Sequence, residues 1–310
     1  MAFIMSAKNR TTSRSVASPQ RRRRTYKIAV VCLLLVLAAV LTAWLLAYGY
    51  NNVSLMPDRA FARRLDAAIE NSHNWVQLNR QDILTGRNIA LIRMLQDIST
   101  MCPDPLYSGI VESFMAGPAR PDCWKRLLDP NWPVISSAFN KTLGQEQIDN
   151  KWILYAIAPE CANVTPEQIR LFDSEHWRER KLTHQLWALV HLCRTQGSND
   201  KLNTLIERLC DRITRSQRFD IAVVDLYIQK TAFVLKAGFP QKIRRRWIER
   251  VITNQEPDGG WNDKWFLFTS IKELPPGLSR SASNQHATVQ ALWLLYQVKC
   301  RYGDQFRLPD

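Results

Sequence analysis

A histidine and an aspartate flank one irregular segment in a way that would suit acid–base chemistry. His286 is predicted at the start of a helix, and Asp263 lies in the aromatic-rich segment 262–282 that precedes this helix. Long segments of this kind often cover a binding site, and an imidazole or carboxylate within hydrogen-bonding reach can transfer protons. His286 and Asp263 are therefore candidates for an acid–base or ligand pair. The alternative is that His286 only bonds backbone at the helix start.

Two more groups could assist this pair. Asp225 and Tyr227 lie at the start of another predicted helix, and Asp220 comes shortly before them. Paired carboxylates carry out glycoside hydrolysis, so we expect Asp225 or Tyr227 to help His286 act on a substrate. Acidic residues near a helix N-terminus also interact favourably with the helix dipole, which is the structural alternative.

Metal and cofactor chemistry find little support in the sequence. His184 and His191 are predicted on one face of a helix, but no third ligand stands at a known metal-binding spacing. No complete nucleophile, metal or nucleotide motif occurs elsewhere. We therefore expect neither a metal nor a cofactor.

Six cysteines lie beyond the apolar N-terminal segment that contains Cys32: Cys102, Cys123, Cys161, Cys193, Cys210 and Cys300. An even number in an oxidising compartment favours disulfides. The local candidates are Cys102 with Cys123 and Cys193 with Cys210, because each pair spans a predicted connection between helices. The alternative is that several of these cysteines are free and buried.

The elements that must position these groups are helices. Beyond residue 60, apolar residues recur mainly at helical spacing. Arg-rich amphipathic segments such as TLIERLCDRIT alternate with more apolar ones such as TVQALWLLYQVKCRYG. Stacked antiparallel hairpins require such alternation, because one helix of each pair faces solvent and the other packs inside. We predict an all-α domain, an α/α solenoid or partial α/α toroid, with hairpins at about 61–98, 165–196, 200–238 and 240–301.

Three aromatic residues, Trp187, Phe233 and Trp293, stand in register on the predicted inner helices. If they fill the centre of the domain, they leave no room there for a substrate. If the centre instead holds a deep pocket with His286 and a carboxylate, an enzyme is favoured.

The stretch NQEPDGGW separates two predicted helices. Pro257 ends the first of them, the glycines permit a positive φ angle, and Trp261 can cover the turn with a large apolar surface. A glutamine side chain can hydrogen-bond exposed backbone at a helix end. We expect a structural clamp between hairpins, made by Gln255, Asp258, Gly259, Gly260 and Trp261.

This motif resembles the repeat of the α/α-toroid superfamily, which includes squalene and oxidosqualene cyclases and protein prenyltransferase β subunits. The resemblance implies a toroid of helical hairpins with a central cavity. The cyclases' D-x-D-D segment is absent, and no Asp-x-Cys follows the Gly-Gly-Trp turn as in the prenyltransferases' zinc site. Neither terpene cyclisation nor a prenyltransferase zinc site is therefore expected.

The N-terminal part predicts a membrane anchor. Residues 1–27 carry Lys or Arg at eight positions and no acidic residue, so we expect a disordered tail. Residues 28–49 contain no charge and are long enough to span a bilayer as a helix. A linker is predicted at 50–60 and the helical domain at 61–310.

Positive charge stays on the cytoplasmic side, so the domain is expected outside the cytosol. We favour the periplasmic side of a bacterial inner membrane, with the Golgi or ER lumen as the alternative. The formal net charge is +14; because the tail holds eight of these charges, the remaining excess is modest and no nucleic-acid partner is expected. The expected partners are the lipid bilayer and a membrane or periplasmic protein.

Two functions remain open at this point. The absence of a complete catalytic motif favours a binding or scaffold subunit of a membrane-associated assembly, because repeat folds commonly bind partners on concave surfaces. The alternative is a cell-envelope enzyme that acts on a carbohydrate or isoprenoid-linked substrate in the toroid cavity.

Overall fold

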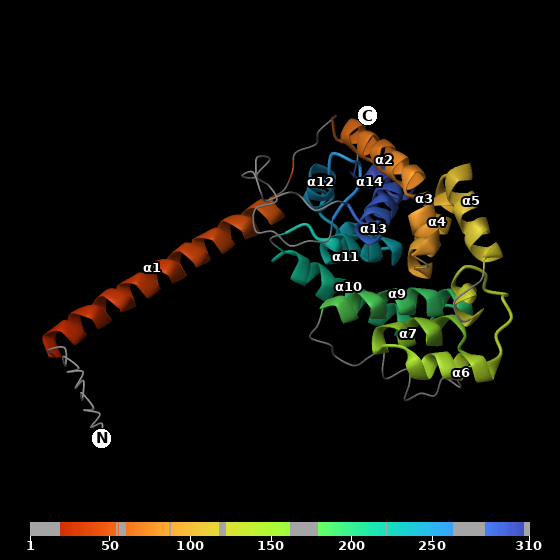
Figure 1. The fold of residues 1–310 in the computed structure, drawn as a ribbon, viewed down its shortest axis with the longest axis horizontal. Coiled ribbons are helices and arrows are strands. Elements are labelled where there is room, and N and C mark those ends of the chain that lie inside the picture. Colours follow the sequence, from red (N-terminus) through yellow and green to blue (C-terminus); the bar gives the residue numbers. More distant parts are fainter. Residues whose placement is uncertain are drawn as a thin grey trace, which may run out of the picture. The chain divides into compact units, whose positions relative to one another are not determined.

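The computed structural model describes residues 19–53, 55, 60–86, 88–117, 122–161, 179–220, 222–262 and 283–306. The chain divides into two compact units, residues 1–47 and 48–310. Every regular element in these described ranges is a helix, and none is a strand (Figure 1). The prediction of an all-α chain is confirmed.

The first helix, α1 (Pro19–Asn52), contains the predicted membrane span. Its segment Tyr26–Asn52 has a mean hydropathy of 2.9 and is long and apolar enough to cross a bilayer. The prediction of an N-terminal apolar helix is confirmed. The helix begins at Pro19, inside the range 1–27 expected to be disordered, because proline suits a first helical turn and the arginines that follow are good helix formers.

The second unit is built from short and medium-length helices. The bounds of its helices are α2 (Ala60–Leu78), α3 (Arg80–Thr85), α4 (Ile89–Met101), α5 (Pro105–Ala116), η1 (Asp122–Leu127), α6 (Ser136–Gln145), α7 (Ile148–Ile157), α9 (Glu179–Gln196), α10 (Asp200–Gln217), α11 (Asp225–Lys236), η2 (Pro240–Lys242), α12 (Arg245–Thr253), α13 (Gln285–Tyr296), η3 (Gln297–Arg301) and α14 (Gly303–Phe306).

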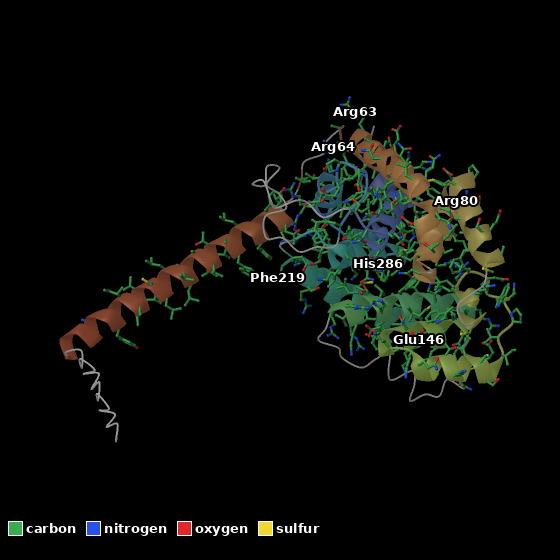
Figure 2. All side chains as sticks on the ribbon, in the orientation of Figure 1. Arg63, Arg64, Arg80, Glu146, Phe219 and His286 are labelled. Carbon is green, nitrogen blue, oxygen red and sulfur yellow. A yellow bond between two sulfur atoms is a disulfide. The ribbon has the colours of Figure 1, made fainter. Side chains whose placement is uncertain are left out.

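Inner and outer helices differ in how they are buried. All residues from Tyr227 to Leu235 in α11 and from Ala287 to Tyr296 in α13 are buried. Helices α2 and α10 instead bury one face and expose the other, and Arg63 and Arg64 project from the exposed side of α2 (Figure 2). Burial on all sides requires neighbours all round, so α11 and α13 belong to the interior.

The inner helices pack in a continuous series. Helix α13 packs against α4 and α11, α11 packs against α9, and α9 packs against α7. The short helix η1 contacts both α7 and α4. Each helix in this series therefore contacts the next one directly. The last of them, η1, contacts α4 again.

Asparagine side chains mark the start of several helices. The Oδ1 atom of Asn88 accepts a hydrogen bond from the Ala90 amide at 3.1 Å, and that of Asn284 accepts one from the Ala287 amide at 2.8 Å. These caps satisfy backbone donors that have no partner inside the helix. They fix where α4 and α13 begin, and therefore which side chains stand at their first turns.

The NQEPDGGW motif joins three helices. The Nε2 atom of Gln255 donates to the Ala68 carbonyl of α2 at 2.8 Å. The Trp261 indole donates to the Val251 carbonyl of α12 at 2.8 Å, and its backbone amide donates to the Thr288 hydroxyl of α13 at 2.9 Å. Trp261 is also only 1% exposed. The motif is therefore packed and hydrogen-bonded between α2, α12 and α13.

The acidic and glycine residues of the motif form its turn. The Oδ1 atom of Asp258 accepts hydrogen bonds from the Gly260 amide at 3.0 Å and the Ser283 hydroxyl at 2.6 Å. Burial opposes ionisation of Asp258, but these hydrogen bonds outweigh it and hold the pKa of the carboxyl below its ordinary value. Gly259 has a φ angle of +88°, and a Cβ atom there would lie 2.4 Å from the Asn71 carbonyl oxygen.

One disulfide, between Cys102 and Cys300, is present in the described residues. It joins the end of α4 to η3, directly after α13, across 198 positions of sequence. The predicted pairs Cys102–Cys123 and Cys193–Cys210 are wrong, since Cys123, Cys193 and Cys210 are free. Helices α4 and α13 pack side by side, and this packing brings Cys102 and Cys300 together although they are far apart in sequence.

The predicted linker 50–60 begins with ordered residues. Helix α1 continues to Asn52, and Asn51 is fully buried in the second unit. The Nδ2 atom of Asn51 donates to the Gln217 carbonyl at 2.7 Å. Residues 48–52 are thus part of the helical domain rather than a spacer before it.

Candidate functional site

A cavity of about 310 Å³ lies where several helices begin. Its walls come from the first turns of α4, α9 and α13, from the start of α7, and from η1. The lining side chains are polar, charged and aromatic: Asn88, Trp124, Glu146, Asn150, Arg180, His184, Trp187 and His286. The wall is therefore more polar than that of most small-molecule sites, whose lining is predominantly apolar.

An open groove of about 520 Å³ adjoins this cavity. The two hollows share Gly86, Asn88 and His286 among their lining residues. The groove is otherwise lined by residues of α2, α3 and the start of α13, including Trp75, Asp82 and Asn284. His286 therefore stands on the border between an enclosed space and one open to solvent.

His286 is held by an aspartate. Its Nδ1 atom lies 2.8 Å from the Oδ1 atom of Asp225, in the first turn of α11. A carboxylate can only accept, so Nδ1 carries the proton in this pair and Nε2 has the free lone pair. The side chains of His286 and Asp225 are 41% and 26% exposed, so solvent reaches the pair.

Gln290 contacts both members of the His286–Asp225 pair. Its Nε2 atom donates to Asp225 Oδ1 at 2.9 Å and lies 3.0 Å from both ring nitrogens of His286. An atom equidistant from both nitrogens at this distance lies over the ring face, since an in-plane position would collide with the ring carbon between them. The in-plane lone pair of His286 Nε2 is therefore left for a ligand.

Glu146 supplies a second carboxylate to the cavity. Its two oxygens accept hydrogen bonds from Trp124 Nε1 at 3.3 Å and Asn150 Nδ2 at 2.7 Å. Figure 2 labels Glu146 and His286, which are far apart in the sequence and line the same cavity. Both donors are neutral, so they orient the Glu146 carboxylate but do not cancel its negative charge.

His184 is a second imidazole in the cavity wall. Burial lowers the pKa of His184 below its ordinary value, although the bond from its Nδ1 to the Arg180 carbonyl opposes the shift. That bond, 2.9 Å long, places the proton on Nδ1. His184 thus stays neutral at neutral pH, with Nε2 as an acceptor.

Helix ends and Arg180 bring positive charge to the cavity wall, which also holds the Glu146 carboxylate. The amino-terminal ends of α4, α9 and α13 converge there, and the N-terminus of a helix carries roughly half a positive charge. Arg180 adds a full charge, while its contact with Asp149 is long at 3.9 Å. Negatively charged or strongly polar ligand groups are favoured next to these helix ends.

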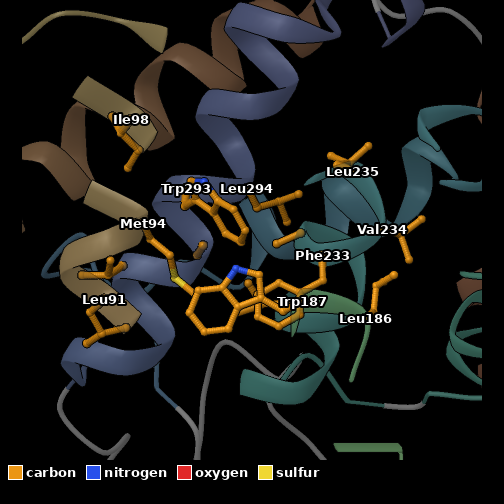
Figure 3. Packing of buried hydrophobic residues seen from close by; sticks show 14 of the residues in the cluster. Leu91, Met94, Ile98, Leu186, Trp187, Phe233, Val234, Leu235, Trp293 and Leu294 are labelled. Atoms are coloured by element: carbon orange, nitrogen blue, oxygen red, sulfur yellow. The ribbon is translucent and has the colours of Figure 1, made fainter. Parts of the chain in front are cut away.

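A packed aromatic column ends at the cavity. The Trp187 and Phe233 rings stack with centroids 5.4 Å apart, and Phe233 meets Trp293 edge to face at 5.7 Å (Figure 3). The three predicted aromatics, which are 3%, 1% and 0% exposed, therefore fill the space between α9, α11 and α13, and no substrate fits there. Trp187 belongs both to this column and to the cavity wall, so the column closes one side of the cavity without filling it.

The remaining predicted groups lie elsewhere. Asp263, with most of segment 262–282, lies outside the described residues. Tyr227 faces away from His286: its hydroxyl donates to Asn51 Oδ1 at 3.0 Å, and burial raises its pKa. Residues two apart on a helix point in nearly opposite directions, so Asp225 and Tyr227 cannot act together. Asp220 instead accepts from the buried Lys230 at 2.8 Å.

Sequence reasoning missed several residues of the cavity. Glu146, Asn150 and Trp124 come from the region 100–160, where proline-containing stretches obscure helical periodicity. His184 was considered only as a metal ligand beside His191, which is buried against Trp187. The spacing of Glu146 and Asn150, four residues apart at a helix start, is too common to mark a site.

The chain matches no protein family model, no curated protein and no solved structure. Its function must therefore be inferred from the chemistry of the cavity itself.

Proposed function

We propose that the protein is a membrane-anchored extracytoplasmic enzyme that carries out acid–base chemistry on a carbohydrate or isoprenoid-linked cell-envelope substrate. The observation that carries the proposal is that His286, positioned by Asp225 at 2.8 Å, lines the same cavity as Glu146. An oriented imidazole and a separate carboxylate are the minimum for proton transfer at two points of one substrate.

The groups of the cavity suit a sugar. Trp124 and Trp187 form part of the cavity wall, while Asn88, Asn150 and Arg180 offer hydrogen bonds to hydroxyl or acidic groups. His286 Nε2 takes a proton from a substrate hydroxyl or carbon acid, and Asp225 stabilises the resulting imidazolium. Glu146 serves the second point of proton transfer or orients the substrate by accepting a hydrogen bond.

The scaffold is proposed to be an α/α toroid. The series of contacts from α4 through α13, α11, α9 and α7 to η1 and back to α4 supports a closed arrangement. The Cys102–Cys300 disulfide supports it further, because it ties the first inner helix to the last. In this arrangement the cavity lies at the amino-terminal ends of the inner helices.

The location is proposed from the N-terminal helix. Helix α1 spans the membrane with the basic tail in the cytoplasm and residues 50–310 on the other side. A disulfide accords with an oxidising compartment. We favour the periplasm of a bacterial inner membrane over the Golgi or ER lumen, and a substrate held in or near the membrane would be delivered to the tethered domain.

A non-catalytic binding or scaffold role is the second candidate. The observation that favours it is the open groove of about 520 Å³, which could hold a segment of a membrane or periplasmic protein. In that case His286 and Asp225 would orient a bound partner rather than transfer protons.

One experiment separates the two candidates. Full-length protein in nanodiscs is incubated with free and lipid-linked envelope saccharides, and mass spectrometry follows any conversion. The enzyme proposal predicts conversion that His286→Gln lowers by about 10²–10⁴-fold. The control His73→Gln alters a histidine that contacts Tyr107 away from both hollows and should leave conversion unchanged.

No conversion, together with a stoichiometric partner recovered from mild detergent, would favour the scaffold instead. Conversion that survives His286→Gln would remove His286 from the mechanism.

A further inference from the structure

Basic and aromatic side chains of the domain donate hydrogen bonds to the last turn of α1. Arg246, Trp247 and Arg244 donate to the carbonyl oxygens of residues 50, 51 and 52, at 3.1, 3.1 and 2.6 Å. These carbonyls have no partner within the helix because they end it. Residues 48–52 therefore have a fixed place beside α12.

The turn between α10 and α11 meets the same residues. The Nδ2 atom of Asn52 donates to the Arg218 carbonyl at 2.6 Å, and the rings of Tyr48 and Phe219 lie 5.2 Å apart. Thus residues from three separate stretches of the second unit meet at residues 48–53. We call Tyr48, Tyr50, Val53, Arg218, Phe219 and Arg246 the juxtamembrane patch.

The patch is apolar and exposed where a soluble surface would be polar. Tyr50 is 53% exposed, and Val53 and Phe219 are each 46% exposed. The other exposed large apolar residues in the described part of the second unit, Leu78 and Ile135, are more exposed still but do not belong to the patch. Aromatic residues gather at the level of lipid headgroups in membrane proteins.

The charge of the patch is positive. Arg218 is exposed, and the Arg246 guanidinium lies 3.8 Å from the centre of the Tyr50 ring. The nearest acidic residue in sequence, Asp220, is matched by Lys230 at 2.8 Å. Guanidinium groups bind phosphate through paired hydrogen bonds, so the patch combines headgroup-binding cations with interfacial aromatics.

The position of the patch follows from chain continuity. Tyr50 comes directly after the uncharged run that ends at Gly49, so if α1 spans the bilayer, as proposed above, the patch lies at the membrane surface. We propose that the juxtamembrane patch binds the phosphate groups of anionic phospholipids through Arg218 and Arg246, with Phe219 and Tyr50 in the headgroup layer.

This assignment does not conflict with an N-terminus in the cytoplasm. The positive-inside rule counts basic residues close in sequence to the span, and long translocated domains follow it weakly. Arg218 and Arg246 reach the membrane surface only after folding, through the α10–α11 turn and α12.

The test uses full-length protein in nanodiscs of equal phosphatidylglycerol and phosphatidylcholine, with native mass spectrometry of the lipids that remain bound. We expect phosphatidylglycerol to be enriched on the unaltered protein. The variant Arg218→Gln/Arg246→Gln should lower the binding preference for phosphatidylglycerol by about 10–30-fold, since each surface cation contributes substantially to anionic-lipid binding. Phe219→Ser should lower the number of retained lipids of both kinds.

The matched control is Lys141→Gln/Lys201→Gln, which removes two exposed positive charges from α6 and the far end of α10. It should keep the preference, and the basic tail is the same in all proteins. Arg218→Gln alone, which leaves the backbone cap of Tyr50 intact, should show an intermediate loss. An unchanged preference in both arginine variants would overturn the proposal.

Alkaline extraction of native membranes checks the anchor separately. Protein released by alkali would contradict a spanning α1 and overturn the patch proposal with it, whereas saccharide conversion in the cavity would be unaffected.

Discussion

The Nδ1 atom of His286 lies 2.8 Å from the Oδ1 atom of Asp225, although the two residues are 61 positions apart in sequence. Each stands in the first turn of an inner helix, and the two helices, α11 and α13, pack side by side. Because both side chains sit at the same end of their helices, the pairing requires the two helices to run in the same direction. One outer helix, α12, lies between them in sequence and reverses the chain.

Gly259→Ala should destabilise the domain strongly. The residue has a φ angle of +88°, and its added Cβ would lie 2.4 Å from a backbone oxygen of α2. We expect the free energy of unfolding, measured by urea titration, to fall by about 2–5 kcal/mol.

Gly197→Ala is the matched control, because Gly197 has nearly the same φ angle, +87°, with no heavy atom within 4 Å of the added Cβ. It should cost only the backbone strain, about 1–2 kcal/mol. Equal losses in the two variants would show that the close approach to α2 does not contribute.

Removing the disulfide should lower stability without changing the fold. Cys102→Ser/Cys300→Ser opens a loop of 198 positions, and we expect a loss of about 3–5 kcal/mol, because the unfolded chain regains conformational freedom. Thermal unfolding with and without reductant provides the measurement.

The variant Cys161→Ser/Cys193→Ser removes two free thiols and keeps the bridge, so its melting temperature should respond to reductant as that of the unaltered protein does. A reductant-insensitive melting temperature in the unaltered protein would contradict the bridge.

His191 should make the domain acid-sensitive. Burial lowers the pKa of His191 well below its ordinary value, and the positive charges of Arg93, Lys236 and Arg194 lower it further. In the unfolded chain the residue titrates near its ordinary value of about 6.5. Below that pH the unfolded state binds a proton that the folded state does not, so stability falls as pH falls.

The slope due to this one group is about 1.4 kcal/mol per pH unit, down to its folded pKa. Urea unfolding of the unaltered protein and His191→Gln between pH 7.5 and 5 isolates it by difference. Parallel pH profiles for the two proteins would refute the assignment.

Asn51→Leu should destabilise the domain as a core substitution does. Asn51 accepts from Arg250 at 2.5 Å and from Tyr227 at 3.0 Å, so leucine leaves both donors buried without this acceptor. We expect a loss of about 2–4 kcal/mol in urea titration. Asn140→Leu, at an exposed position of α6, should change stability by no more than about 0.5 kcal/mol; a similar loss in both would mean that residues 48–52 act only as a linker.

Local patterns in the sequence were sufficient for the helices between residues 200 and 301. Helices α10 and α11 fall within the predicted hairpin 200–238, and α12 and α13 within 240–301. Helical periodicity and the glycine and proline residues that end helices depend only on neighbouring residues. They can therefore be recognised without knowledge of the fold. The aromatic register of Trp187, Phe233 and Trp293 could be read in the same way.

These local patterns did not predict which residues meet over long sequence distances. Cys102 was paired with a nearby cysteine because sequence distance was the only guide, whereas the packing of α4 on α13 brings Cys300 to it. Glu146 lines the cavity beside residues of η1 and α7, and these two helices carry no repeat signal in the sequence. Tyr227 was grouped with Asp225 by proximity in sequence, but helix geometry turns it toward Asn51.

The central claim is that Asp225 positions His286 for proton transfer in the cavity. It is tested most directly by the rate of saccharide conversion by Asp225→Asn against Asp200→Asn, since both aspartates stand in the first turn of a helix. If Asp225 only favours its helix dipole, the two variants should behave alike. The account predicts that Asp225→Asn lowers kcat by about 10²–10⁴-fold, with little change in KM or stability, while Asp200→Asn keeps the full rate. Equal rates for the two variants would contradict it.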